Sequence, residues 1–198
     1  VVEAYTSNVD KHTPIHPEYV ADLIDRNADE DAIFTVDTGM CNVWGARYIT
    51  ANGKREQIGS FRHGTMANAL PQALGAQAAN PGRQVITFSG DGGLSMLMGE
   101  LLTVKLHNLP IKMFVFNNSS LGMVKLEMLV QGLPEHETDH ESVNFAKIAE
   151  ASGIKHFRIE DPKEAPEQIK KALAYNGPAL IDVCLLYTSD AADEEDSV

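Results

Sequence analysis

Short apolar runs and stretches with helical spacing alternate along the chain. The runs are rich in β-branched and aromatic residues, and most end in polar or small residues, which is typical of strands. The two central runs are nearly continuous in apolar character, so they predict parallel strands buried on both faces. The six predicted strands span residues 32–36, 57–61, 85–89, 111–117, 154–159 and 179–185.

Helical spacing fills the intervals between these runs. A first helix is expected after Pro17, ending near Asn27. Further helices are expected over residues 40–49, 67–79, 143–151 and 162–175, and two more begin near residues 94 and 121. Strands that alternate with helices indicate an α/β fold, here a doubly wound, mainly parallel sheet of about six strands with helices on both faces. This domain is expected to span residues 14–186. Residues 1–13 are predicted to be a linker from upstream domains, and the acidic residues 187–198 a disordered or artefactual tail.

Composition and charge narrow the function classes. Hydrophobic residues make up 43% of the chain and charged residues 22%, which is ordinary for a globular protein. The 16 basic and 28 acidic residues give a net charge of −12, which argues against a nucleic-acid surface. No apolar run approaches the ~20 residues that span a bilayer, and the first residues lack the pattern of an export signal. Cys41 and Cys184 are expected to be free thiols, and a cytoplasmic location is predicted.

The chemistry-bearing residues gather where two predicted strands end. Asp91 lies in a Gly-Asp-Gly-Gly segment directly after strand 85–89, and Asn118 follows strand 111–117. The helix between the two strands is expected to fold them side by side. Asp91 and Asn118, 27 residues apart in sequence, would then meet at the sheet edge where open α/β sheets bind ligands.

These residue types favour a hard cation and a phosphate group. A carboxylate, an amide oxygen and turn carbonyls suit Mg²⁺, which usually bridges to phosphate. The glycines let the backbone approach a phosphate, and the following helix offers its free N–H groups to it. No Lys or Arg lies between Arg83 and Lys105, so the metal would supply most of the positive charge.

Each motif also has a purely structural explanation when taken alone. The Gly-Asp-Gly-Gly segment can be a tight turn between a strand and a helix, and Asn117-Asn118 can fill a turn that needs left-handed geometry. A dinucleotide-binding fingerprint would need glycine at position 95, where Ser95 stands. The Gly-Asp-Gly-Gly and Asn117-Asn118 segments are both expected at neighbouring strand ends. This joint placement favours a ligand-binding site over two unrelated turns.

The segment GDG, followed by NN about 27 residues later, resembles the thiamine-diphosphate motif. The resemblance extends over residues 12–185, because GSFRHGTMANALPQALGAQ, SMLMGELLTVKLHNLP and NFAKIAEASGI are similar to pyruvate oxidases and pyruvate:quinone dehydrogenases. It implies that thiamine diphosphate and Mg²⁺ bind here. The metal ligands would be the Asp91 carboxylate, the Asn118 side chain and the Ser120 carbonyl.

The same resemblance implies roles for further residues. Gly64, Thr65 and Met66 would hold the aminopyrimidine, with the Met66 side chain wedging the cofactor into its bent form. Met123 and Glu127 are the candidate catalytic residues on the substrate side, although an exposed helical glutamate is the plain alternative for Glu127. The complete implied cofactor-binding set is Gly64, Thr65, Met66, Asp91, Gly92, Gly93, Asn118, Ser119, Ser120, Leu121, Gly122, Met123 and Val124.

The activity that the resemblance implies is oxidative decarboxylation of pyruvate to acetate or acetyl phosphate, with electrons passing to FAD in a full-length homodimer or homotetramer. The FAD domain and the glutamate that activates the aminopyrimidine, usually from a partner subunit, would lie outside this chain. Membrane attachment would need a C-terminal tail that is missing here. The alternative enzyme is an acetolactate synthase, which the segment LGMV favours, and the alternative without catalysis is a cofactor-free scaffold or dimerisation module.

Histidines do not form a predicted site. His136 and His140 are four residues apart in a polar loop over residues 131–141, where no helical pattern places both on one face. They are expected to be solvated, and His63 is expected to be structural or to face solvent.

Overall fold

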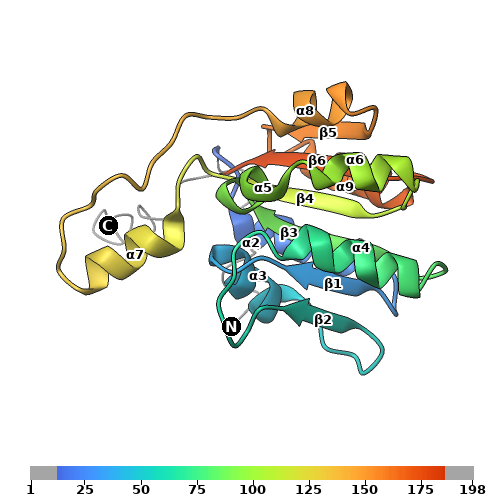
Figure 1. The fold of residues 1–198 in the computed structure, drawn as a ribbon, viewed down its shortest axis with the longest axis horizontal. Coiled ribbons are helices and arrows are strands. Elements are labelled where there is room, and N and C mark those ends of the chain that lie inside the picture. The colour runs from blue at the N-terminus through green and yellow to red at the C-terminus, as the bar shows by residue number, and fades with distance from the viewer. Residues whose placement is uncertain (1–12, 186–198) are drawn as a thin grey trace.

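A six-stranded sheet, parallel throughout, forms the centre of the protein (Figure 1). The computed structural model describes residues 13–185. The strands lie in the order β2-β1-β3-β4-β6-β5. Their bounds are β1 Ile33–Val36, β2 Glu56–Gly59, β3 Val85–Gly90, β4 Lys112–Asn117, β5 Lys155–Ile159 and β6 Ala179–Cys184.

Helices cover both faces of this sheet, so the predicted α/β doubly wound fold is confirmed. On one face, helices α2, α3 and α9 bury side chains against Phe34, Phe88 and Phe114. On the other face, α4, α5, α6 and α8 pack on Ile33, Met113 and Leu180. The helix bounds are α2 Pro17–Asn27, α3 Met40–Tyr48, α4 Ala69–Ala79, α5 Asp91–Leu97, α6 Glu100–Leu106, α7 Gly122–Val130, α8 Phe145–Ala151 and α9 Ala165–Ala174.

The strand order places a topological switch point beside β1. The chain runs from β1 outward to β2, and then returns to place β3 on the other side of β1. Connections that leave in opposite directions open a crevice beyond the carboxyl ends of the two central strands, and ligands of open α/β sheets bind there. The carboxyl end of β4 lies next to that of β3, because the two strands pair in parallel.

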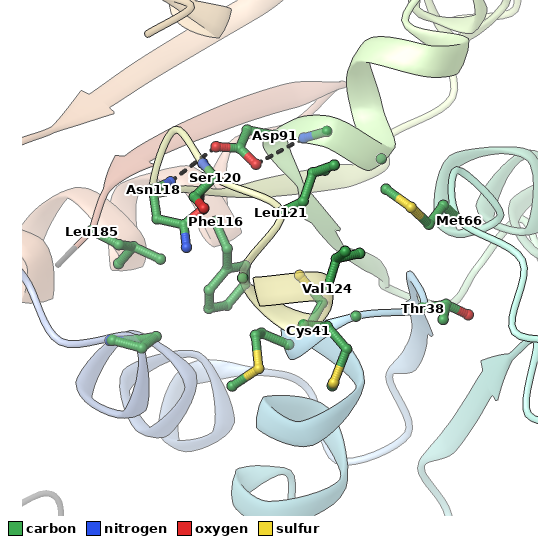
Figure 2. A pocket seen from close by; sticks show the side chains of 18 of the residues that line it. Thr38, Cys41, Met66, Asp91, Phe116, Asn118, Ser120, Leu121, Val124 and Leu185 are labelled. Atoms are coloured by element: carbon green, nitrogen blue, oxygen red, sulfur yellow. Dashed lines mark hydrogen bonds between the residues drawn. The ribbon is translucent and has the colours of Figure 1, made fainter. Parts of the chain in front are cut away.

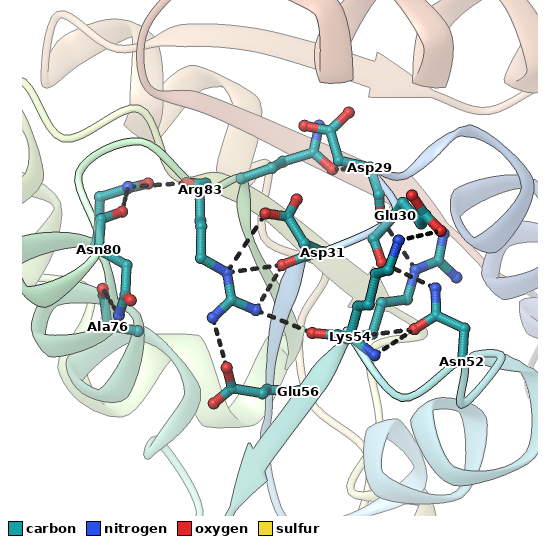
Figure 3. A network of polar contacts seen from close by, with 12 residues as sticks. Asp29, Glu30, Asp31, Asn52, Lys54, Glu56, Ala76, Asn80 and Arg83 are labelled. Carbon is teal, nitrogen blue, oxygen red and sulfur yellow. Dashed lines mark hydrogen bonds and ion pairs between the residues drawn. The ribbon is translucent and has the colours of Figure 1, made fainter.

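The opposite ends of these strands are fastened by a polar network (Figure 3). The guanidinium of Arg83 donates to the carbonyl of Asp31 at 2.6 and 2.8 Å and to the carboxylate of Glu56 at 2.5 Å. Lys54 pairs with Glu30 at 2.7 Å. The network thus connects the segments that lead into β1, β2 and β3. These segments lie at the amino ends of the strands, opposite the crevice.

Some predicted boundaries were wrong. The helix expected from about residue 94 begins at Asp91 and is interrupted at Met98 and Gly99, so it forms two helices, α5 and α6. The second strand ends at Gly59 rather than at Phe61, whose side chain is exposed. The predictions for residues 1–12 and 186–198 lie outside the described residues.

Helix α7 differs from the other helices because none of its residues is buried. In Figure 1 it lies to one side of the sheet, and a long connection leads from it back to α8. No helix within residues 13–185 is long and apolar enough to cross a membrane.

Candidate functional site

A pocket opens at the carboxyl ends of β1, β3 and β4, next to the switch point (Figure 2). The loop after β1, the start of α5 and the loop from β4 into α7 each contribute to its wall. Pro17 and Leu185 close it from the side of β6 and α2. The other lining residues are Thr38, Gly39, Met40, Cys41, Trp44, Met66, Gly90, Asp91, Gly92, Gly93, Phe116, Asn118, Ser120, Leu121, Gly122, Met123 and Val124.

The carboxylate of Asp91 joins two of these segments. Its Oδ1 accepts a hydrogen bond from the backbone N–H of Gly92 at 2.8 Å. Its Oδ2 accepts from the backbone N–H of Asn118 at 3.1 Å (Figure 2). The same oxygen accepts from the backbone N–H of Ser119 at 2.6 Å. The expected meeting of Asp91 with the Asn118 loop across the sheet edge is therefore confirmed.

The two asparagines at the end of β4 serve different purposes. Asn117 turns inward, where its side chain donates to Asp182 and to the carbonyl of Val143, both at 2.9 Å. Asn118 lines the pocket, and its Oδ1 accepts a hydrogen bond from the backbone N–H of Ser120 at 3.3 Å. Asn117 thus secures the strand end, and Asn118 presents its amide to the site.

Burial gives Asp91 an affinity for a cation. The side chain is almost fully buried, and desolvation raises the pKa of its carboxyl above the ordinary value. The N–H groups of Gly92, Ser119 and Asn118 counteract part of this shift, because they stabilise the charged form. A cation placed next to the carboxylate would offset the remaining cost of holding a charge in this environment.

The donor set fits a magnesium ion bound to a diphosphate. Asp91 and Asn118 provide carboxylate and amide oxygens beside the Ser120 loop, and Mg²⁺ prefers oxygen ligands and keeps further positions for phosphate oxygens. No group of three or more His, Cys, Asp or Glu side chains that could hold a metal occurs within residues 13–185. A cation here would therefore depend on amide and backbone oxygens.

The pocket wall also suits a diphosphate. Around the position of a Cβ atom at Gly39 there is open space, and its φ of 127° is one that L side chains rarely adopt. The backbone of this loop is thus accessible from the pocket. None of the lining residues named above is Lys or Arg, so the charge of a diphosphate would have to be balanced by the metal and by backbone N–H groups.

Most of the predicted site residues line this pocket. Gly64 and Thr65 are exposed and outside its lining, and Ser119 takes part through its backbone bond to Asp91. Glu127 lies on an exposed part of α7, away from the lining, so its catalytic role stays a prediction. The predicted residues in the lining are Met66, Asp91, Gly92, Gly93, Asn118, Ser120, Leu121, Gly122, Met123 and Val124.

The sequence analysis missed the part of the site that follows β1. Cys41 and Trp44 of α3 are buried, and they also line the pocket. Before them lies Asp37, a buried carboxylate at the end of β1. The signal was present, since a polar Asp-Thr-Gly segment follows the first predicted strand just as Gly-Asp-Gly-Gly follows the third.

Asp37 has an incompletely satisfied carboxylate. Its Oδ1 accepts from the N–H of Ala69 at 2.8 Å, whereas its Oδ2 is buried and has no hydrogen-bond partner within residues 13–185. A Cβ atom at Gly93 would lie 2.4 Å from this Oδ2. Burial raises the pKa of Asp37 from 3.8 to about 6.

The prediction that both loop histidines are solvated was wrong for His140. His136 is exposed, but the His140 side chain is only 31% exposed, and its Nε2 lies 3.6 Å from Oδ2 of Asp91. No local sequence pattern indicates this contact, because it arises where the connection after α7 folds back onto the loop after β4.

Comparison with known proteins agrees with this geometry. Residues 37–183 match the family model described as thiamine pyrophosphate enzyme, C-terminal TPP binding domain. The chain is 35% identical over 173 residues to YdaP of Bacillus subtilis, a protein named for thiamine pyrophosphate, covering 87% of this chain and 30% of that protein. It is 37% identical over 177 residues to an acetolactate synthase large subunit of Porphyra purpurea, covering 87% of this chain and 29% of that protein.

A third relative is the acetolactate synthase large subunit of Lactococcus lactis, which is 35% identical over 173 residues. The match covers 86% of this chain and 30% of that subunit. The chain therefore spans about 30% of the length of the curated relatives it matches.

The raised pKa of Asp37 predicts a pH-dependent stability. Between pH 3.8 and about 6 the folded protein holds a proton that the unfolded chain has lost, so the free energy of unfolding falls as pH rises through this window. The total loss should be about 3 kcal/mol, since each pKa unit corresponds to about 1.4 kcal/mol.

Urea denaturation from pH 3.5 to 7.5 measures this effect against the variant Asp37→Asn, which keeps an acceptor for Ala69. The wild type should lose stability relative to Asp37→Asn as pH rises, with little further change above about pH 7. A difference between the two proteins that is independent of pH would contradict the assignment.

Proposed function

The chain belongs to the thiamine pyrophosphate enzyme family, as its C-terminal TPP binding domain, and from this premise we propose that it is the cofactor-binding part of a longer enzyme acting on a 2-keto acid such as pyruvate. The observation that carries the proposal is the buried Asp91 carboxylate, which is hydrogen-bonded to the Asn118 loop in the wall of a pocket whose lining holds no Lys or Arg.

The chain's residues would hold the cofactor by its diphosphate end. Thiamine diphosphate, the same molecule as thiamine pyrophosphate, supplies the nucleophilic carbon and the electron sink for decarboxylation. Asp91, the Asn118 side chain and the Ser120 carbonyl would bind Mg²⁺, and backbone N–H groups of the glycine loops would donate hydrogen bonds to the phosphate oxygens. Met66 and Met123 would contact the rest of the cofactor from opposite segments of the pocket wall.

Acetolactate synthase is the activity that we propose for the longer enzyme. The relatives from Porphyra and Lactococcus carry that name at 37% and 35% identity. The segment LGMV, residues 121–124, also resembles acetolactate synthases, and its residues form the pocket wall on the side of α7. The apolar side chains in this segment would help to exclude water from a bound cofactor.

Pyruvate oxidase or pyruvate:quinone dehydrogenase, with FAD in the full-length enzyme, is the second candidate. Two sequence observations favour it. The segment HGTMANALPQALGAQ, which begins at His63, is similar to that group, and the sequence Trp-Glu-Asp does not follow LGMVKLEM. In either case the longer enzyme would be a homodimer or homotetramer, and a partner subunit would supply the glutamate that activates the aminopyrimidine.

Removing the Asp91 carboxylate should abolish Mg²⁺-dependent binding of thiamine diphosphate. We expect Asp91→Ala to weaken binding by roughly 100-fold or more, because loss of even an outer-shell partner typically costs 10–100-fold in metal affinity. Isothermal titration calorimetry with Mg²⁺ and thiamine diphosphate measures the change. Asp91→Asn separates the charge from the hydrogen bonds, because its amide oxygen can still accept from the Asn118 loop.

The control for that titration is Glu150→Ala, which removes an exposed carboxylate from α8 and should leave the affinity unchanged. Unchanged affinity in both Asp91 variants would contradict the assignment of the ligand. A wild-type chain that binds no thiamine diphosphate would instead favour the cofactor-free scaffold.

The two candidate activities differ in their product. The longer enzyme, supplied with pyruvate, should form acetolactate and should release CO₂ without reducing an added quinone. Colorimetric detection of acetolactate and spectrophotometry of the quinone distinguish the two outcomes. Quinone reduction without acetolactate would replace the first candidate by the second.

The 198-residue chain by itself should release no CO₂ from pyruvate. The activating glutamate that the family resemblance implies would belong to another domain, so the cofactor would be held without being activated. A radiometric assay with carboxyl-labelled pyruvate, with the longer enzyme as the positive control, tests this. Steady CO₂ release by the purified chain would show that no second domain is needed.

A further inference from the structure

The part of the pocket wall that Met66 forms is held by a carboxylate that does not line the pocket. Met66 belongs to a short segment before α4, residues 65–68, which we call the Met66 turn. Asp37 follows the last residue of β1 and is almost fully buried. Its Oδ1 accepts a hydrogen bond from the backbone N–H of Ala69, the first residue of α4, at 2.8 Å. The Met66 turn therefore ends at a residue that is bonded to the end of β1.

Asp37 caps α4 from another element of the fold. The N-cap residue, Asn68, makes no capping hydrogen bond with its own side chain. Its Nδ2 donates instead to the carbonyl of Thr65 at 2.6 Å and lies 3.5 Å from Oδ1 of Asp37. A carboxylate at a helix N-terminus satisfies a free N–H group and interacts favourably with the helix dipole. Asp37 thus supplies the cap that the residues before α4 do not provide.

The first residue of α4 is bonded to β1 through both of its backbone polar groups. The hydroxyl of Thr35, two residues before Asp37, donates to the carbonyl of Ala69 at 2.8 Å. The backbone N–H of Asp37 donates to the carbonyl of Phe88 in β3 at 2.9 Å, so the carboxylate itself is held by the central sheet. The start of α4 therefore has a fixed position relative to β1 and β3.

The Met66 turn needs such an anchor because its backbone is strained. Ala67, directly after Met66, has a φ of 61°, in the left-handed region that residues with a side chain rarely adopt. A residue keeps this conformation only where the surrounding contacts determine it. Without the bond from Ala69 to Asp37, we expect the turn to relax and Met66 to leave its place in the pocket wall.

Asp37 also lies against the start of α5. A Cβ atom at Gly93 would overlap Oδ2 of Asp37 and would lie 3.5 Å from the backbone nitrogen of Ala67. A Cβ atom at Gly92 would lie 3.6 Å from Cε of Met66. The carboxylate is therefore located where the Met66 turn meets the helix that begins with the proposed metal ligand.

We propose that Asp37 is a positioning residue for Met66, which it holds at a fixed distance from the start of α5, so that the pocket favours thiamine diphosphate over diphosphate alone. This inference rests on the proposed function, because it assigns the rings of that cofactor to the Met66 side of the pocket. Asp37 acts through the Met66 turn and not by contact with the ligand, since it is outside the pocket lining.

Calorimetric titration of the chain with two ligands, each in the presence of Mg²⁺, tests the proposal. Asp37→Ala should weaken the binding of thiamine diphosphate by roughly five- to tenfold, the equivalent of losing a typical helix N-cap, and that of inorganic pyrophosphate by less than about twofold. Asp37→Asn has the same size and keeps an acceptor for the N–H of Ala69, so both affinities should stay close to those of the wild type.

Methyl NMR of the chain labelled at its methionine Cε atoms measures the position of Met66 itself. Thiamine diphosphate with Mg²⁺ should shift the Met66 resonance, assigned with Met66→Leu, in the wild type and in Asp37→Asn. In Asp37→Ala this shift should be lost. The resonance of Met123, on another segment of the pocket wall, should shift in all three proteins, whereas a general loss of structure would change both resonances.

The control for reduced stability is Ile169→Ala, which removes a buried side chain of α9 outside the pocket lining. It should lower the free energy of unfolding and leave both affinities unchanged. Circular dichroism checks that each variant is folded. If Asp37→Ala does not fold, Asn68→Ala replaces it, because it breaks the bond to Thr65 within the same turn and should cause the same selective loss.

Two results would overturn this inference and leave the proposed function intact. One is an equal loss of affinity for thiamine diphosphate and pyrophosphate in the variant that lacks the bond. The other is no loss for either ligand. A wild-type chain that binds neither ligand in the presence of Mg²⁺ would overturn the proposed function, and this inference with it.

Discussion

The site depends on hydrogen bonds between the Asp91 carboxylate and the backbone of the loop after β4. Asp91, the first residue of α5, accepts backbone N–H groups from its own helix and from the loop after β4. Ser119 has a positive φ of 56°, a conformation that costs energy for a residue with a side chain. Its 2.6 Å bond to Asp91 offsets that cost. The geometry of the Asn118 loop is thus set by the same side chain that would bind the metal.

The polar groups at the two ends of the sheet differ in how completely they are hydrogen-bonded. At the amino ends of β1, β2 and β3, Arg83 satisfies backbone carbonyls and a carboxylate together (Figure 3). At the carboxyl ends the polar groups are left less completely paired, as Oδ2 of Asp37 and Nε2 of His140 are. A buried polar group without a partner costs about 1–3 kcal/mol, so such groups concentrate where a ligand or an ion can satisfy them.

Much of this arrangement could be predicted because it follows from local patterns. Continuous apolar runs identify buried parallel strands, and parallel strands place their carboxyl ends together, which is sufficient to pair Asp91 with the Asn118 loop. His140 could not be predicted in this way. Its position depends on residues 138–140, which pair with residues 119–121 on the other side of α7, 17 to 21 residues earlier in the chain. The interruption at Gly99 was missed because α5 and α6 continue the same apolar spacing across it.

The glycines after Asp91 are required for different reasons. A Cβ at Gly92 would lie 2.7 Å from Cδ2 of Leu121, the end of a flexible side chain that can move aside. A Cβ at Gly93 would lie 2.4 Å from Oδ2 of Asp37, in a carboxylate held by the N–H of Ala69. That carboxylate cannot retreat without breaking its bond, so Gly93 is the stricter requirement. The closeness of α5 to the end of β1, and with it the width of the pocket between them, is therefore set by the absence of one methyl group at position 93.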